Sequence, residues 1–239
     1  MLPITVLRPH YMSNFDADGS AENEWDEQGD LAWNEFDWER YLQQQDEALK
    51  TYLSHYEKLK NHPDRIDEVA HLMGWDQDSW TGDDSDESTS EVPKAEDEIG
   101  DYDLDPYTFH KNPIFVSTKA LYLSLKISWE KLASDAHRAP QPLGLAFLMS
   151  LQRGEEHALF AIQALDMGDY ALGVSLFKRS LREINQTFAL IDTKAASHSS
   201  ALAMYREFAL PRLFDLREIW LRVMNECREE LERNLDDEN

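Results

Sequence analysis

The sequence predicts an all-α protein, with an up-down four-helix bundle in the C-terminal half, an N-terminal helical extension and an acidic linker. Nine glycines and nine prolines in 239 residues leave few chain breaks, which favours long helices over a strand-rich fold. Apolar residues make up 42% of the chain, enough for a folded core. Residues 1–115 hold 29 Asp and Glu against 8 Lys and Arg, whereas residues 116–239 hold 18 against 15. This asymmetry predicts a solvated acidic part and a packed part.

Residues 1–34 are predicted to form an extended acidic arm. Its acidic stretch is interrupted by Trp25 and Trp33, whose large rings are stabilised by burial. We therefore expect these two tryptophans to anchor the arm on a neighbouring surface.

Residues 35–75 are predicted to form a helical segment that packs on the bundle. Asn34 is the expected N-cap of its first helix, because an asparagine side chain accepts hydrogen bonds from the first backbone amides of a helix. A second, short helix has Pro63 in its first turn and Gly74 at its end. The first helix has a seam with steps of three and four residues, made of Trp38, Leu42, Gln45, Leu49, Tyr52, Tyr56 and Leu59.

Residues 76–113 are predicted to form an acidic, mobile linker. Between Asp76 and Asp105 the chain has 13 acidic residues and one basic residue, Lys94. Like charges at this density repel one another, and the segment has little apolar surface to offset the entropy lost on ordering. We expect residues 81–100 to be exposed.

Residues 114–239 contain four long amphipathic segments joined by short connections, a pattern typical of an up-down bundle. Pro211 lies within the last segment and predicts a kink or break near Ala209–Leu210. In the third segment apolar residues recur in steps of four and three, the spacing of helices that pack nearly antiparallel. The expected helices cover residues 116–137, 141–166, 170–195 and 199–235.

Glu155 lies in the apolar seam of the second of these helices, where a carboxylate is costly unless it is paired. The turn to the next helix is centred near residues 168–169, so antiparallel packing places Arg182 opposite Glu155. We therefore predict a structural ion pair between Glu155 and Arg182 that fixes the register of the two helices. The alternative is a metal-binding or catalytic carboxylate in the core of the bundle.

Glu155, His157 and Glu183 are the candidate ligands of such a metal site. Di-metal bundles use Glu-x-x-His because residues three apart share one face of a helix. His157 is two residues from Glu155 and therefore points about 200° away from it on the helix. Glu-x-x-His does not occur in the four C-terminal segments. The pattern predicts no metal, no cofactor and no catalytic residue.

Small and aromatic residues recur along residues 154–187, at Ala161, Gly168, Tyr170, Gly173, Phe177 and Ser180. At these positions the segment resembles one tetratricopeptide repeat, with His157 in place of the usual tryptophan and Asn185 in place of the usual proline. The resemblance covers 34 residues, and no second copy lies in register on either side. It implies a helical hairpin of the kind that binds proteins.

Motifs of the common enzyme classes are absent from the sequence, which has no Gly-x-Ser-x-Gly, phosphate-binding glycine loop or dinucleotide fingerprint. Cys227 lies in an apolar seam and indicates a small buried side chain rather than a nucleophile. In the last helix arginines such as Arg212 alternate with acids such as Asp215, which predicts a solvated charged helix.

We therefore expect a non-catalytic protein-binding or regulatory protein. Its partner would be a protein, with a basic surface suited to the acidic segment. Nucleic acid and membrane are not expected to bind directly a chain with a net charge of −24. Two alternatives are a carboxylate-based metal-binding or enzymatic bundle, and an acidic nucleic-acid mimic that binds a basic partner. The sequence is also compatible with a homo-oligomer.

The single cysteine, and the lack of a basic and apolar leader in residues 1–9, make us expect a cytoplasmic protein.

Overall fold

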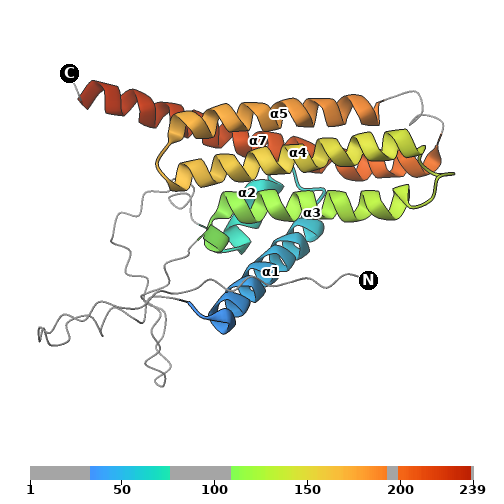
Figure 1. Cartoon of the computed structure of the whole chain (residues 1–239), viewed down its shortest axis with the longest axis horizontal. Coiled ribbons are helices and arrows are strands. Elements are labelled where there is room, and N and C mark those ends of the chain that lie inside the picture. The colour runs from blue at the N-terminus through green and yellow to red at the C-terminus, as the bar shows by residue number, and fades with distance from the viewer. Residues whose placement is uncertain (1–32, 76–108, 193–198, 238–239) are drawn as a thin grey trace, which may run out of the picture. The chain divides into compact units, whose positions relative to one another are not determined.

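The computed structural model describes residues 33–75, 109–192 and 199–237, and over these residues the protein is helical (Figure 1). The predicted all-α class is therefore confirmed for this part of the chain. The predicted acidic arm and linker lie almost wholly outside the described residues. None of the described helices has an apolar stretch long enough to cross a membrane.

The elements are α1 (Glu35–Lys58), α2 (Arg65–Leu72), the 3-10 helix η3 (Phe109–Lys111), α3 (Pro113–Ala133), α4 (Gln141–Asp166), α5 (Tyr170–Ile191) and α7 (Ser200–Asp237).

The chain divides into two units, Met1–Trp38 and Glu39–Asn239. The described part of the first unit is the start of α1, where Asn34 caps the helix as predicted. Its Oδ1 accepts hydrogen bonds from two backbone N–H groups of the first turn, at 2.8 and 3.2 Å. Asp37 Oδ2 accepts in return from the Asn34 N–H at 3.1 Å. This reciprocal bonding satisfies amides that have no partner within the helix.

The seam predicted on α1 is confirmed only in its second half. Leu49, Tyr52 and Tyr56 are buried and belong to the core of the second unit. Leu42, by contrast, is 50% exposed, and its neighbour Tyr41 is buried instead. The first residue of α1 that belongs to this buried core is Leu49, so the apolar spacing before it does not correspond to core packing.

The short helix α2 ends as the sequence predicts. Gly74 adopts a φ of +74°, a left-handed conformation that glycine tolerates best. The chain then folds back, because the Trp75 N–H donates to the Ala70 carbonyl at 2.9 Å. The Trp75 ring stacks on Tyr52 with centroids 5.9 Å apart, which attaches the end of α2 to α1.

Four long helices follow, and α3 and α5 each pack against both α4 and α7 (Figure 1). Their ends lie within about four residues of the predicted ones. Helix α3 begins before the predicted residue 116 because the Asn112 side chain caps it, accepting from the Ile114 and Phe115 N–H groups at 2.9 and 3.1 Å. The up-down bundle itself stays a prediction.

Pro211 does not interrupt α7, which continues from Ser200 to Asp237. Of the predicted kink or break near Ala209–Leu210, the break is therefore wrong, and the kink stays a prediction. Buried residues lie on both sides of the proline, with Ala209 and Leu213 both 0% exposed. Their packing stabilises the helix across a position where a backbone N–H is missing.

Large aromatic residues fill the core of the second unit, and several of them place a polar group on a specific partner. Trp129 Nε1 donates to the Gly144 carbonyl at 3.0 Å, and Trp220 Nε1 donates to Thr118 Oγ1 at 3.0 Å. The Tyr205 hydroxyl donates to the Leu125 carbonyl at 3.0 Å. Such bonds satisfy polar groups that burial would otherwise leave without water.

Candidate functional site

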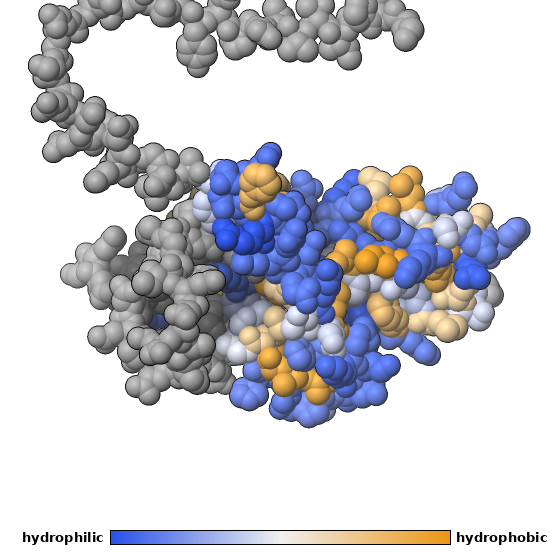
Figure 2. All heavy atoms as spheres, turned by 90° about the horizontal axis from the view of Figure 1, so that it is seen from below, coloured by the Kyte–Doolittle hydropathy of each residue, from blue (hydrophilic) through white to orange (hydrophobic). Residues whose placement is uncertain are grey.

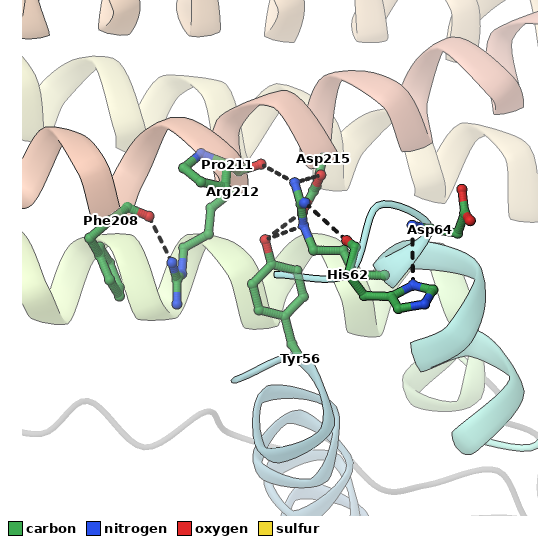
Figure 3. Close-up of polar contacts among 8 residues, drawn as sticks. Tyr56, His62, Asp64, Phe208, Pro211, Arg212 and Asp215 are labelled. Atoms are coloured by element: carbon green, nitrogen blue, oxygen red, sulfur yellow. Dashed lines mark hydrogen bonds and ion pairs between the residues drawn. The ribbon is translucent and has the colours of Figure 1, made fainter. Parts of the chain in front are cut away.

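A buried ion pair joins α2 to α7. The Arg65 guanidinium donates to both carboxylate oxygens of Asp215, with Nε–Oδ2 at 2.6 Å and Nη2–Oδ1 at 2.5 Å (Figure 3). The two side chains are only 17% and 7% exposed. The hydroxyl of Tyr56, from the last turn of α1, donates to the same carboxylate. Because a two-pronged arginine–carboxylate pair has a defined geometry, these three side chains hold the end of α1, the start of α2 and the middle of α7 together.

Burial and neighbouring charge shift the pKa values of Tyr56 and Arg65 in this network. Burial raises the pKa of the Tyr56 hydroxyl, and the nearby Asp215 carboxylate raises it further. The phenol therefore stays protonated and remains a hydrogen-bond donor. Burial alone would lower the pKa of Arg65, but its hydrogen bonds to Asp215 and Tyr56 outweigh burial and raise that pKa above its usual value.

A second arginine, Arg212, is buried beside this ion pair at 4% exposure. Its guanidinium carbon lies 3.5 Å from the ring centre of Phe208 and 5.3 Å from that of Tyr56. One terminal nitrogen donates to the Phe208 carbonyl at 2.7 Å and the other to Glu57 (Figure 3 shows the bond to Phe208). Stacking on aromatic faces and pairing with Glu57 stabilise a cation that is otherwise costly to bury.

Asp215 of this ion pair lines a groove of about 470 Å³ between α2 and α7. Side chains of both helices and of the turn before α2 line it. The apolar lining consists of Pro63, Ile66, Phe214 and Leu221, and the charged lining of Asp64, Asp67, Asp215, Arg217, Glu218 and Arg222. This mixture of apolar and charged groups suits a peptide or protein surface better than a purely apolar ligand.

Phe214 is the largest apolar side chain of the groove and is 51% exposed. Its neighbours in α7, Leu213 and Asp215, are buried, so its backbone is fixed while its ring faces outward. The ring contacts Phe188 of α5 with centroids 4.9 Å apart. An aromatic side chain held in this way can be covered by a partner at little cost in conformational entropy.

The charged lining of the groove is paired in part. Arg222 bridges the two helices, donating to Asp67 of α2 (Nη2–Oδ2 3.3 Å) and to Glu218 of its own helix (Nε–Oε1 3.0 Å). These hydrogen bonds, above all the one to Asp67, raise the pKa of Arg222. In contrast, no ion pair joins Arg217 or Asp64 to another described residue. One cation and one anion of the lining therefore remain accessible to a partner.

Glu155 is buried on α4, but the structure pairs it with Lys126 of α3 instead of the predicted Arg182. The Lys126 Nζ–Glu155 Oε2 distance is 2.5 Å, and the side chains are 23% and 11% exposed. Arg182 is exposed on α5. The prediction considered only the hairpin of α4 and α5. Helix α3 also packs on α4, and its lysine reaches the carboxylate from the other side.

Glu155 and Glu183 lie near the same buried phenol. Burial raises the pKa of Tyr122, and the charges of both glutamates raise it further. Glu183 Oε2 is buried and has no hydrogen-bond partner within the described structure. His157, the third candidate ligand, is half-buried on α4. Among the described residues, no three His, Cys, Asp or Glu side chains gather closely enough to hold a metal ion.

The network around Asp215 differs from the prediction of a solvated charged helix. Arg212 and Asp215 of that helix are only 4% and 5% exposed. For Arg212 a signal existed, since it lies four and seven residues before the buried Leu216 and Ile219 and so shares their face. Two of its partners, Tyr56 and Glu57, however, come from a distant part of the chain.

Cys227 is a buried thiol, as the sequence predicts. It is 4% exposed on α7, and burial raises its pKa to about 11. A thiol with such a pKa is almost fully protonated near neutral pH and is therefore a poor nucleophile.

Comparison of the chain with models of known protein families, with curated protein sequences and with solved structures found no match.

Proposed function

We propose that this is a non-catalytic protein-binding protein and that the groove between α2 and α7 receives a segment of its partner. The observation that carries this proposal is the position of Phe214. Its ring is half-exposed on a helix that a buried ion pair fixes, next to a hollow of about 470 Å³. Rigid aromatic side chains next to pockets are frequent anchors of protein interfaces.

The charges of the groove specify the chemistry of the partner. An apolar side chain of the partner would lie on Phe214 and Leu221. An acidic group beside it would pair with Arg217, and a basic group would pair with Asp64, because neither has an ion-pair partner among the described residues. Arg222 already binds Asp67 and Glu218, so it contributes to the wall of the groove rather than to specificity.

Exposed apolar residues outside this groove are weaker candidates for a binding site. On the face shown in Figure 2, apolar side chains form small patches separated by hydrophilic residues. Leu145 and Met204 are even more exposed than Phe214, at 62% and 72%. Neither lines the groove, and single exposed apolar residues are normal on protein surfaces.

Photo-cross-linking in cells that naturally express the protein tests this function. A photoreactive phenylalanine analogue replaces Phe214 in one variant and Leu145 in a control variant. We expect a covalent adduct with another protein from position 214, and its loss when Arg217→Glu is added. Equal adducts from both positions, or an adduct made only of two copies of the chain, would contradict the proposal.

We also propose that α3, α4, α5 and α7 form an up-down four-helix bundle. Support comes from the packing of α3 and α5 against both α4 and α7, which closes a ring of four contacts. The turn between α4 and α5 is tight, with Gly168 at a φ of +77°, as expected for neighbouring antiparallel helices. An experimental structure with these four helices around one shared core would support the bundle.

For the cellular location we propose the cytoplasm. The single cysteine, Cys227, is buried, so the fold depends on no disulfide and needs no oxidising compartment. Fractionation of cells that express the protein naturally would test this location, and recovery from a secreted fraction would contradict it.

A further inference from the structure

The exposed face of α5 differs in charge from the rest of this acidic protein. Along Tyr170–Ile191 the exposed charged residues are Lys178, Arg179 and Arg182, and none of the exposed residues is acidic. The one acidic residue of the helix, Glu183, is half-buried with its Oε2 shielded from solvent. We call Lys178, Arg179 and Arg182 the α5 basic face.

None of these three cations forms an ion pair with another described residue, although the chain has 47 acidic residues and 23 basic ones. Some exposed arginines elsewhere in the described structure do pair, as Arg206 does with Asp192 at 2.9 Å. The spacing along α5 places the three cations on two adjacent turns of one side of the helix, within about 6 Å along its axis. Three cations this close repel one another, and an acidic ligand would relieve that repulsion.

We propose that the α5 basic face binds the acidic segment of this same chain, residues 83–105. That segment has eleven acidic residues and one basic residue, Lys94, so its charge is complementary to the α5 basic face. The described residues stop at Trp75 and resume at Phe109. The 33 residues between them, at roughly 3.4 Å per residue, can reach roughly 55 Å outward and back. A tethered segment also has a high effective concentration at any surface within its reach.

Zero-length carbodiimide cross-linking of the full-length protein tests this contact, since it joins a lysine only to a carboxylate that touches it. Equal amounts of unlabelled and nitrogen-15-labelled protein are mixed, cross-linked and analysed by peptide mass spectrometry. We expect Lys178 to be joined to residues 83–105 within one isotopic copy. The yield should exceed that of Lys131, an exposed lysine on α3. It should fall to the Lys131 level in 1 M salt, where the screening length drops to about 3 Å.

The double variant Arg179→Gln, Arg182→Gln should lower the Lys178 cross-link several-fold while its lysine stays in place. The matched control Arg138→Gln, Arg228→Gln removes two exposed arginines outside α5 and should leave the yield unchanged, with circular dichroism confirming that both variants are folded. Cross-links between copies of different isotope content would assign the segment to a second copy and overturn the proposal. A Lys178 yield no higher than that of Lys131 would overturn it as well. Neither result bears on the groove, because Phe214 takes no part in this experiment.

Discussion

Arg65 and Asp215 are 150 positions apart in the chain, yet their side chains meet in a two-pronged ion pair that is largely shielded from water, with side-chain exposures of 17% and 7%. Removing one partner leaves the other charge buried without compensation, which is far more costly than the net stabilisation of the intact pair. The pair therefore helps to hold the start of α2 against α7, beside the groove that these two helices line.

Replacing Asp215 by asparagine should lower the free energy of unfolding by about 3 kcal/mol, because Arg65 would keep its charge with no carboxylate beside it. Urea unfolding measures the change. Asp192→Asn is the matched control, since its pair with Arg206 is 56% and 46% exposed and should contribute less than about 1 kcal/mol. Equal losses in the two variants would show that burial of the Arg65–Asp215 pair is unimportant.

A double-mutant cycle between Glu155→Gln and Lys126→Met should give a coupling energy of about 1–2 kcal/mol, because the two charged groups are in direct contact. The same cycle between Glu155→Gln and Arg182→Gln should be additive within about 0.5 kcal/mol. Coupling to Arg182 instead of Lys126 would restore the ion pair expected from the sequence and contradict the observed one.

Two glycines of α4 should respond in opposite ways to alanine. A Cβ on Gly154 would lie 2.5 Å from the Tyr122 hydroxyl oxygen, so Gly154→Ala should destabilise the protein by about 1–3 kcal/mol through overpacking. At Gly144 the nearest atom would be the Ala133 Cβ at 3.6 Å, an ordinary contact. Gly144→Ala should therefore stabilise by about 0.5–1 kcal/mol, since alanine favours the helix. Thermal unfolding of both variants distinguishes the signs.

Alkaline pH should unfold the protein through its buried tyrosines. Burial raises the pKa values of Tyr52, Tyr56, Tyr122 and Tyr205 above the usual 10.0. Above that pH the unfolded chain loses phenol protons that the folded chain retains, so the folded state binds more protons and its stability falls as pH rises. Phenolate absorbance should therefore appear together with the loss of helicity. Tyr122→Phe should make the fall of stability with pH shallower, and an unchanged slope would argue against a shifted pKa at that residue.

Cys227 should react slowly in the folded protein. Its pKa of about 11, against an ordinary value of 9.0, reduces the thiolate fraction about 100-fold at neutral pH. Alkylation by iodoacetamide, followed by mass spectrometry, should be slower than in urea by at least that factor. Similar rates in the two conditions would mean that the thiol is accessible and its pKa unshifted.

The sequence was informative wherever the structure depends on neighbouring residues. Asn34 caps α1 and Gly74 ends α2 because the bonds and backbone angles they satisfy lie within a few positions. The ends of the four long helices are local in the same sense, whereas the first half of the predicted α1 seam is exposed because burial depends on what packs against it. Helix α7 does not break at Pro211 because tertiary packing on both sides of it outweighs a local penalty.

The candidate site could not be predicted because its contacts are distant in the sequence. The residues next to Arg65 and Asp215 in the sequence give no sign that the two side chains meet. Their pairing depends on the packing of α2 against α7. Glu155 likewise pairs with Lys126 rather than Arg182 because α3, and not α5, places a cation next to the carboxylate. Spacing along one helix reveals a face, but it does not reveal which other helix covers that face.

The most direct measurement of the central claim is the affinity of the cross-linked partner for three forms of the protein, determined by titration calorimetry. If the groove between α2 and α7 binds the partner around Phe214, Phe214→Ala should weaken binding at least about 30-fold relative to the unmodified protein, the loss expected of an interface anchor. Leu145→Ala, on an even more exposed residue outside the groove, should change the affinity less than about twofold. Equal affinities of the unmodified protein and the Phe214→Ala variant would contradict the proposal that this groove is the binding site.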